Sequence, residues 1–174
     1  MTTFLRWRIA PFVLTAILFA SCSGQSVLFR QAARATTVHA DEFGGELLRI
    51  AENARNTLSV FFWHLNRPEA GEGGFSVKYA FSTDGAADIG TEQIWIDNIT
   101  FRNGRYYGTV ASSPVYLVGI RRGDRVNFHA DAITDWMFTR SGRIVGGYSI
   151  RYLLEQIPEA ERTEGQQRML QMFE

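Results

Sequence analysis

The sequence predicts an α+β fold, in which one N-terminal amphipathic helix packs on a strongly bent, mostly antiparallel meander or partial barrel of about six or seven strands. A C-terminal helix follows the last strand. Three observations predict this architecture. Apolar residues recur every three or four positions between residues 46 and 63, they alternate with polar residues from residue 75 onwards, and turn signals separate the alternating runs. The 174 residues suffice for one folded domain, with little room for a second core.

The first 21 residues predict a lipoprotein-type signal peptide that is removed from the mature chain. Arg6 and Arg8 precede an uncharged, largely apolar run over residues 9–20, which is too short to span a bilayer comfortably. The alternative is an uncleaved anchor helix, which the interruption at Pro11 and the polar sequence beyond residue 22 disfavour.

Cys22 is the only cysteine, so the chain has no internal disulfide and no thiolate metal cluster. The segment Phe19-Ala20-Ser21-Cys22 resembles a bacterial lipobox, with Phe in place of the usual Leu. By this resemblance, cleavage before Cys22 leaves its thiol to carry lipid, and two or more acyl chains give stable anchoring. Ser23 stands where an Asp would favour retention in the inner membrane. We therefore expect a lipid-anchored envelope protein in the outer membrane, facing the periplasm.

Residues 22–41 contain the lipidated cysteine and a stretch rich in Ser, Gln, Ala and Thr, which predicts a flexible tether. One amphipathic helix is then predicted over residues 46–63, with an apolar face fit to cover a sheet. This apolar face consists of Leu47, Leu48, Ala51, Ala54, Leu58, Phe61, Phe62 and Leu65. Arg67-Pro68 ends the helix.

The strands follow from alternation and turn residues. Residues 75–81 alternate strictly and predict a half-buried strand. Strands over residues 92–102 and 105–112 meet at Asn103-Gly104, which predicts a hairpin because both residues accept positive φ. Two further hairpins are predicted, one from residues 115–120 and 125–130 and one from residues 133–139 and 143–147.

The C-terminal part is predicted to be helical. A helix over residues 148–156 has Ser149 as its expected N-cap, and residues 158–174 form a weaker helical tail. The predicted folded domain therefore extends over residues 42–157.

Three elements in series resemble the YegJ-like family of bacterial proteins. These elements are Gly123-Asp124-Arg125-Val126-Asn127-Phe128, Ile133-Thr134-Asp135-Trp136-Met137 and Gly146-Gly147-Tyr148. The resemblance covers residues 46–152, and the family is defined by a domain of unknown function. It therefore implies a fold and, for some members, an envelope location, but it implies no reaction and no catalytic residues.

The charge of the chain disfavours a nucleic-acid partner. The 18 basic and 18 acidic residues cancel, and removal of Arg6 and Arg8 leaves 16 basic against 18 acidic residues, a net charge of minus two. Arg121, Arg122 and Arg125 cluster at one predicted hairpin. We interpret them as a solvated turn, with anionic lipid headgroups as the alternative partner.

His129 and Asp131 are a candidate metal pair, because two residues two apart on a predicted strand lie on one face. The sequence offers no evident third ligand, and a metal site normally needs three or four. A solvated strand face is therefore the favoured interpretation, and we expect no metal and no cofactor. His64, at the end of the predicted helix, is interpreted as a partly buried cap or packing residue rather than as a base.

Asp135 and Trp136 form a second candidate pair. Trp136 is expected in the core, where its indole N–H needs an acceptor. Asp135 is expected to accept hydrogen bonds from the backbone of a neighbouring turn. The functional alternative places Asp135 in a pocket with Arg151 or Asp124.

Gly146 and Gly147 precede the predicted C-terminal helix and could expose backbone N–H groups to an anion. No Lys or Ser/Thr set of the phosphate-loop kind accompanies them. Close packing or positive φ is therefore the favoured explanation for both glycines.

The function that these observations favour is a non-catalytic binding module in the envelope, which binds a protein, a peptide or an envelope component. An uncovered antiparallel edge would suit an extended peptide that adds a strand. One alternative is a hydrolase-like envelope enzyme that uses Asp135, His129 or Asp131 as acid or base. Another is an immunity-type inhibitor.

Overall fold

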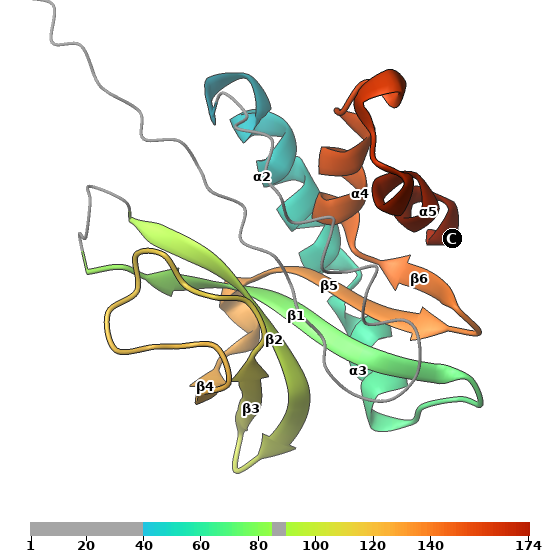
Figure 1. Cartoon of the computed structure of the whole chain (residues 1–174). Coiled ribbons are helices and arrows are strands. Elements are labelled where there is room, and N and C mark those ends of the chain that lie inside the picture. Colours follow the sequence, from blue (N-terminus) through green and yellow to red (C-terminus); the bar gives the residue numbers. More distant parts are fainter. Residues whose placement is uncertain (1–39, 85–89) are drawn as a thin grey trace, which may run out of the picture.

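The computed structural model describes residues 40–84 and 90–174 (Figure 1). The predicted signal peptide, Cys22 and nearly all of the predicted tether lie outside the described residues. The first described helix begins at Ala40, so residues 40 and 41 of the predicted tether are helical.

One antiparallel sheet forms the centre of the fold. Its strands are β1 (Glu72–Ser82), β2 (Thr91–Arg102), β3 (Arg105–Val110), β4 (Arg125–Phe128), β5 (Ile133–Arg140) and β6 (Arg143–Gly146). They lie in the order β4-β3-β2-β1-β5-β6, and every neighbouring pair is antiparallel. Register shifts in β1 and β2 bend the sheet without closing it, because a bulge increases the local twist. The predicted α+β class is confirmed.

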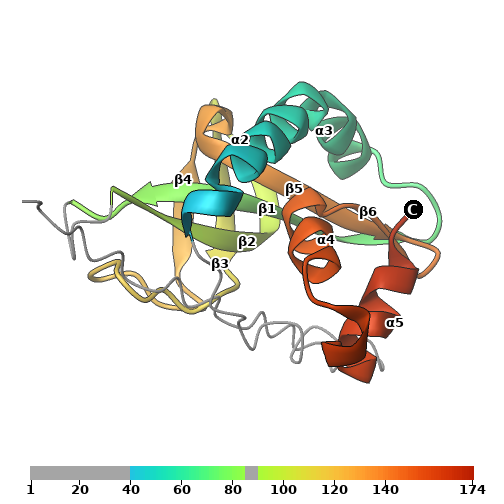
Figure 2. The ribbon, with the colours of Figure 1, turned by 90° about the horizontal axis from the view of Figure 1, so that it is seen from above.

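Helices lie on both sides of this sheet. They are α2 (Ala40–Asn56), α3 (Leu58–Asn66), α4 (Tyr148–Glu155) and α5 (Glu164–Met172), with short 3-10 turns at η2 (Ala130–Ala132) and η3 (Glu159–Glu161). Figure 2 shows α2 and α3 on one side and α4 and α5 on the other. Among the described residues, no helix has the length and apolar character needed to cross a membrane.

The predicted single helix over residues 46–63 is divided at Thr57, which corrects that prediction. The Ala54 carbonyl accepts a hydrogen bond from the Trp136 indole at 3.0 Å, and the Thr57 hydroxyl bonds to the Asn53 carbonyl at 2.9 Å. The next turn is tightened by the Val60 amide, which donates to the Thr57 carbonyl. Competition for these carbonyls therefore separates α2 from α3. The predicted apolar face is also too wide, because Leu48 is 71% exposed.

The core has two parts, one on each face of the sheet. Beneath α2 and α3, the buried residues include Phe61, Val77, Trp136 and Phe138. The second part lies beneath α4 and α5; its buried residues are Trp95, Ala111, Met137, Ile144, Leu154, Met169 and Phe173. Because β5 contributes to both parts, it is buried on both faces.

Two of the three predicted hairpins are confirmed. β2 and β3 turn at Asn103 and Gly104, whose φ values are +51° and +76°, and β5 and β6 turn at Ser141 and Gly142. The predicted strand over residues 115–120 is wrong: this segment is a loop, and β4 pairs with β3 instead. The amides of residues 115–117 donate to the Glu92 carboxylate, so they are not available to a strand ladder.

The C-terminal residues lie along β6. Helix α5 begins with a capping box between Thr163 and Gln166. After it, Phe173 forms a parallel bridge with Ile144, and the Glu174 amide donates to the Ile144 carbonyl at 3.0 Å. The outer edge of β6 is therefore covered by the protein's own C-terminus.

Candidate functional site

Asp135 lies at the centre of the most densely bonded polar group in the fold. Its side chain comes from β5 and is 0% exposed. Oδ1 accepts from the Trp136 amide at 2.8 Å and the Tyr148 amide at 3.2 Å. Oδ2 accepts from the Ser149 amide at 2.8 Å and the Ser149 hydroxyl at 2.6 Å.

Lys78 completes this group, which we call the Asp135 cluster: Lys78, Asp135 and Ser149. The Lys78 ammonium donates to the Ser149 hydroxyl oxygen at 3.1 Å, and Lys78 is the direct register partner of Asp135 across β1 and β5. Burial raises the pKa of Asp135, while the Ser149 hydrogen bonds and the Lys78 charge oppose this shift. Burial lowers the pKa of Lys78, and the charge of Asp135 opposes that shift.

The hydrogen bonds of the Asp135 cluster hold the start of α4 against β5. The Tyr148 and Ser149 amides are the first donors of α4, so Asp135 satisfies groups that the helix itself leaves unpaired. The Ser149 hydroxyl donates to Asp135 and accepts from Lys78, and Ser149 is only 4% exposed. It is therefore neither free nor accessible as a nucleophile. The predicted backbone bonding of Asp135 is confirmed, whereas the predicted N-cap at Ser149 is wrong, because Gly147 precedes the helix.

Trp136 and the two glycines pack together next to this cluster. The Trp136 indole donates to the Ala54 carbonyl, as the prediction of a buried Trp with a partner requires. A Cβ at Gly146 would lie 2.3 Å from the Trp136 carbonyl oxygen, and one at Gly147 would lie 3.0 Å from the Phe173 ring. Both glycines have positive φ. The close-packing explanation is confirmed, and the Gly147 amide is used internally by the Trp136 carbonyl.

His129 and Asp131 do not lie on a strand, which corrects the prediction of one shared strand face. β4 ends at Phe128, His129 precedes the 3-10 turn η2, and both His129 and Asp131 are exposed. The described residues contain no group of three or more His, Cys, Asp or Glu side chains arranged to hold a metal. The structure therefore does not bring this pair into the Asp135 cluster.

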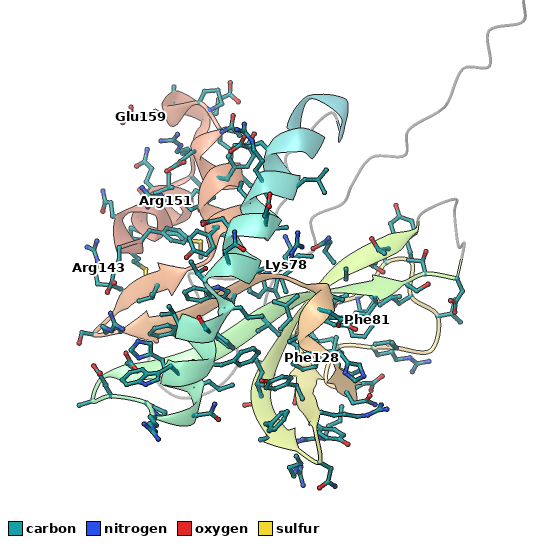
Figure 3. The ribbon with its side chains drawn as sticks, turned by 180° about the vertical axis from the view of Figure 1, so that it is seen from behind. Lys78, Phe81, Phe128, Arg143, Arg151 and Glu159 are labelled. Atoms are coloured by element: carbon teal, nitrogen blue, oxygen red, sulfur yellow. The ribbon has the colours of Figure 1, made fainter. Side chains whose placement is uncertain are left out.

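The proposed pocket partners of Asp135 are engaged elsewhere. Arg151 is exposed on α4, where it pairs with Glu155 at 2.9 Å and donates to the Glu174 carbonyl at 3.2 Å. Asp124 accepts from the Arg121 amide at 2.8 Å. Figure 3 shows Arg151 near α4 and α5, at the end of the molecule opposite to Phe128 of β4.

A second polar cluster, formed by His64, Glu72 and Arg140, was not predicted from the sequence. His64 Nδ1 lies 3.0 Å from Glu72, and Arg140 Nε donates to Glu72 at 2.9 Å. Arg140 also lies 3.2 Å from His64 Nε2, so Nε2 accepts and Nδ1–H donates to Glu72. Burial alone would raise the pKa of Glu72, but bonds from the Glu69 amide, Arg140 and His64 lower it overall. Glu72 is 8 positions from His64 and 68 positions from Arg140 in the sequence. No local sequence pattern connects these three residues.

The solvent-facing side of α3 contains a shallow hollow. It is lined by Ser59, Phe62, Trp63, Asn66 and Arg67. None of these residues belongs to the Asp135 cluster or to the cluster around Glu72. The hollow borders the cluster around Glu72 through Trp63, whose ring centroid lies 4.6 Å from that of His64.

The two edges of the sheet differ in what covers them. The C-terminus covers β6, whereas β4 is the last strand at the other end of the sheet. The Val110 amide donates to the Asp124 carbonyl at 2.9 Å, so alternation turns the backbone groups of Val126 and Phe128 toward β3. The backbone N–H and C=O groups of Arg125 and Asn127 consequently point outward.

The comparisons with known proteins find a family but no assigned activity. Residues 45–170 match a family model described as "Uncharacterized protein conserved in bacteria (DUF2314)". The chain is 30% identical over 113 residues to the uncharacterised protein YegJ of Escherichia coli K12, covering 65% of this chain and 70% of that protein. No solved structure matches.

A second relative comes from Neisseria meningitidis serogroup B and is named as an ankyrin repeat protein. It is 35% identical over 120 residues, which cover 67% of this chain and 47% of that protein. The matched part therefore spans about half the length of the Neisseria protein.

Proposed function

The chain belongs to the DUF2314 family of uncharacterised proteins conserved in bacteria, and we propose that it is a non-catalytic binding module held in the cell envelope by lipid at Cys22. The partner is an extended peptide segment that adds a strand to the outer edge of β4. Strand addition uses backbone hydrogen bonds for affinity and alternate side chains for specificity.

The observation that carries this proposal is the open edge of β4. The backbone groups of Arg125 and Asn127 point away from β3, and β4 is only four residues long. A short edge strand offers few backbone groups, which limits unspecific pairing with the edge strands of other chains. A peptide therefore needs matching side chains, in addition to backbone hydrogen bonds, in order to bind. The lipobox-like segment that ends at Cys22 supports the envelope location.

The polar clusters favour a binding role over acid–base catalysis. Asp135 and Glu72 each receive several hydrogen bonds from their own fold, and His64 uses both ring nitrogens. A general acid or base must reach the substrate's proton directly or through water. Buried groups committed to helix capping and to ion pairing do not meet this requirement.

The name of the Neisseria relative also favours binding. It refers to ankyrin repeats, and stacked repeats of that kind form extended binding surfaces. A related domain in the same chain as such repeats is consistent with a module that contributes to recognition.

Asn127→Pro tests strand addition at β4, with Asn127→Ala as the matched control. Both variants lose the hydrogen bond from Arg105 to the Asn127 side chain, which is 3.1 Å long. Only the proline removes the outward N–H, and proline is tolerated on edge strands. We expect the proline variant alone to lose partners that wild type captures from solubilised bacterial envelopes.

Amide hydrogen exchange on the captured complex identifies the edge directly. Protection of the Arg125 and Asn127 amides, together with retention by Asn127→Ala, supports the proposal. Equal capture by the proline variant, or unprotected amides at both positions, overturns it. Unchanged circular dichroism of the two variants excludes loss of the fold as the cause.

A further inference from the structure

The loop between β3 and β4, residues 111–124, exposes apolar side chains. Val118 is 91% exposed and Val115 is 46% exposed. Leu117 and Ile120 are partly exposed in the same segment. Figure 1 shows it as the long loop between the β3 and β4 arrows. Adjacent exposed apolar residues on one loop are typical of a contact with another molecule or a membrane.

The protein holds this loop in place through its backbone. The Glu92 carboxylate of β2 accepts from the amides of Val115, Tyr116 and Leu117 at 2.6, 2.9 and 3.0 Å. At the far end, the Gly123 amide donates to the Val110 carbonyl at 2.8 Å. The valine side chains are thus presented to solvent by a fixed backbone.

The charges on the loop suit an anionic surface. Arg121 and Arg122 directly follow the apolar residues, and Arg122 acts electrostatically on Asp97. Among the acids around the loop, Glu92 is buried and accepts the loop amides, and the exposed Asp124 accepts the Arg121 amide. The three exposed arginines at positions 121, 122 and 125 outnumber the remaining carboxylates of Asp97 and Asp124. Cations next to exposed apolar side chains are the combination by which interfacial segments bind anionic lipids.

We propose that this loop docks on an anionic lipid bilayer, with Val115 and Val118 in the interfacial layer and Arg121 and Arg122 at the headgroups. Binding of the valines removes apolar area from water, and the arginines add electrostatic attraction. The proposed envelope location determines only which bilayer the loop meets. If the β4 edge were found not to bind a peptide, the proposal that the loop binds anionic lipid would be unaffected.

The test uses the full chain with Cys22→Ser and Val118→Cys, labelled with an environment-sensitive dye. Because the chain has one native cysteine, the dye then reports on position 118 alone. The probe membranes are vesicles of phosphatidylcholine with phosphatidylglycerol, compared with phosphatidylcholine alone. We expect a blue shift and quenching by lipid-borne quenchers only on the anionic vesicles.

The matched control places the dye at Glu164→Cys on α5, where the native side chain is 89% exposed. This dye should stay in water even if the N-terminal segment binds the same vesicles. Arg121→Gln with Arg122→Gln should weaken the position-118 response about fivefold per arginine, since each contributes about 1 kcal/mol near an anionic surface. Arg168→Gln should not change it.

Two outcomes would overturn the proposal. The first is a position-118 dye that remains in water while the chain is bound to anionic vesicles, as a loop that serves a protein partner would show. The second is a blue shift of equal size at positions 118 and 164, because loop-specific insertion cannot produce it.

Discussion

At the scale of single residues, the polar side chains with reactive chemistry serve the fold. Asp135 connects β5 to the first turn of α4 by accepting hydrogen bonds from the Ser149 amide and hydroxyl. Lys78 of β1 donates to the same Ser149 hydroxyl. Elements β1, β5 and α4 therefore meet at the hydrogen-bonded pair of Asp135 and Ser149. Exposed groups such as Asp131 have no comparable set of partners among the described contacts.

Asp135→Ala should lower the free energy of unfolding by about 3 kcal/mol or more, because it leaves the buried Ser149 donors without their acceptor and Lys78 without the opposite charge beside it. Asp131→Ala should stay within about 0.5 kcal/mol of wild type, as expected for an exposed side chain. Urea denaturation measures both. Equal midpoints for the two variants would contradict the structural role of Asp135.

Gly146→Ala should also destabilise strongly, by about 3 kcal/mol or more, since φ is +77° and the added Cβ would overlap the Trp136 carbonyl and ring. Gly73 is the matched control, because a Cβ there meets no atom within 4 Å. Gly73→Ala should change stability by less than about 1 kcal/mol. Thermal melts compare the two, and equal effects would show that the contact with Trp136 is unimportant.

At the scale of elements, side chains from other elements decide where helices begin and end. Trp136 on β5 takes the carbonyl that would have continued α2, and Asp135 accepts the first amides of α4. His64 at the end of α3 is joined through Glu72 and Arg140 to the outer ends of β1 and β5. Helices α2, α3 and α4 are thereby fixed to the sheet by polar bonds as well as by apolar packing.

The bonds to Glu72 predict a pH dependence. Its pKa in the folded protein lies below the ordinary value of 4.5, so the ionised form favours the fold. This contribution is present above about pH 4.5 and is lost as the pH falls through the folded pKa. Glu72→Gln should therefore lose less stability than wild type between neutral and acidic pH.

Denaturant titrations at several pH values measure this difference. Glu164→Gln is the matched control, because that carboxylate is 89% exposed and its ion pair with Arg168 contributes little. The Glu164→Gln control should lose as much stability as wild type when the pH is lowered. A Glu72→Gln profile parallel to wild type would refute the contribution of the buried carboxylate.

At the scale of the whole molecule, the sheet presents two different ends. The end at β6 is closed by Phe173 and Glu174, while the end at β4 carries outward backbone groups. The loop that exposes Val118 leads into β4. In the proposed arrangement, the open strand edge and the bilayer-docking loop therefore belong to the same end of the protein.

Attachment of lipid at Cys22 would hold the whole molecule at the membrane. Cys22→Ala should abolish incorporation of labelled fatty acid and should release or misprocess the protein, because the lipid-bearing thiol is gone. Metabolic labelling with membrane fractionation measures both effects. A Cys22→Ala product that is still labelled and still in the membrane fraction would refute lipidation at Cys22.

The sequence by itself determined the fold class, the Asn103-Gly104 and Ser141-Gly142 hairpins, the core position of Trp136 and the backbone bonding of Asp135. These features depend on local periodicity, on turn residues that accept positive φ, and on the cost of burying an unpaired polar group.

Only the tertiary structure decided the rest. The break at Thr57 depends on an indole 79 positions away, the loop over residues 115–117 depends on the Glu92 carboxylate, and His64 depends on Arg140. In each case a side chain from a distant segment forms a hydrogen bond that the local sequence does not predict. Such long-range contacts leave no periodic pattern in the sequence, so only the folded structure reveals them.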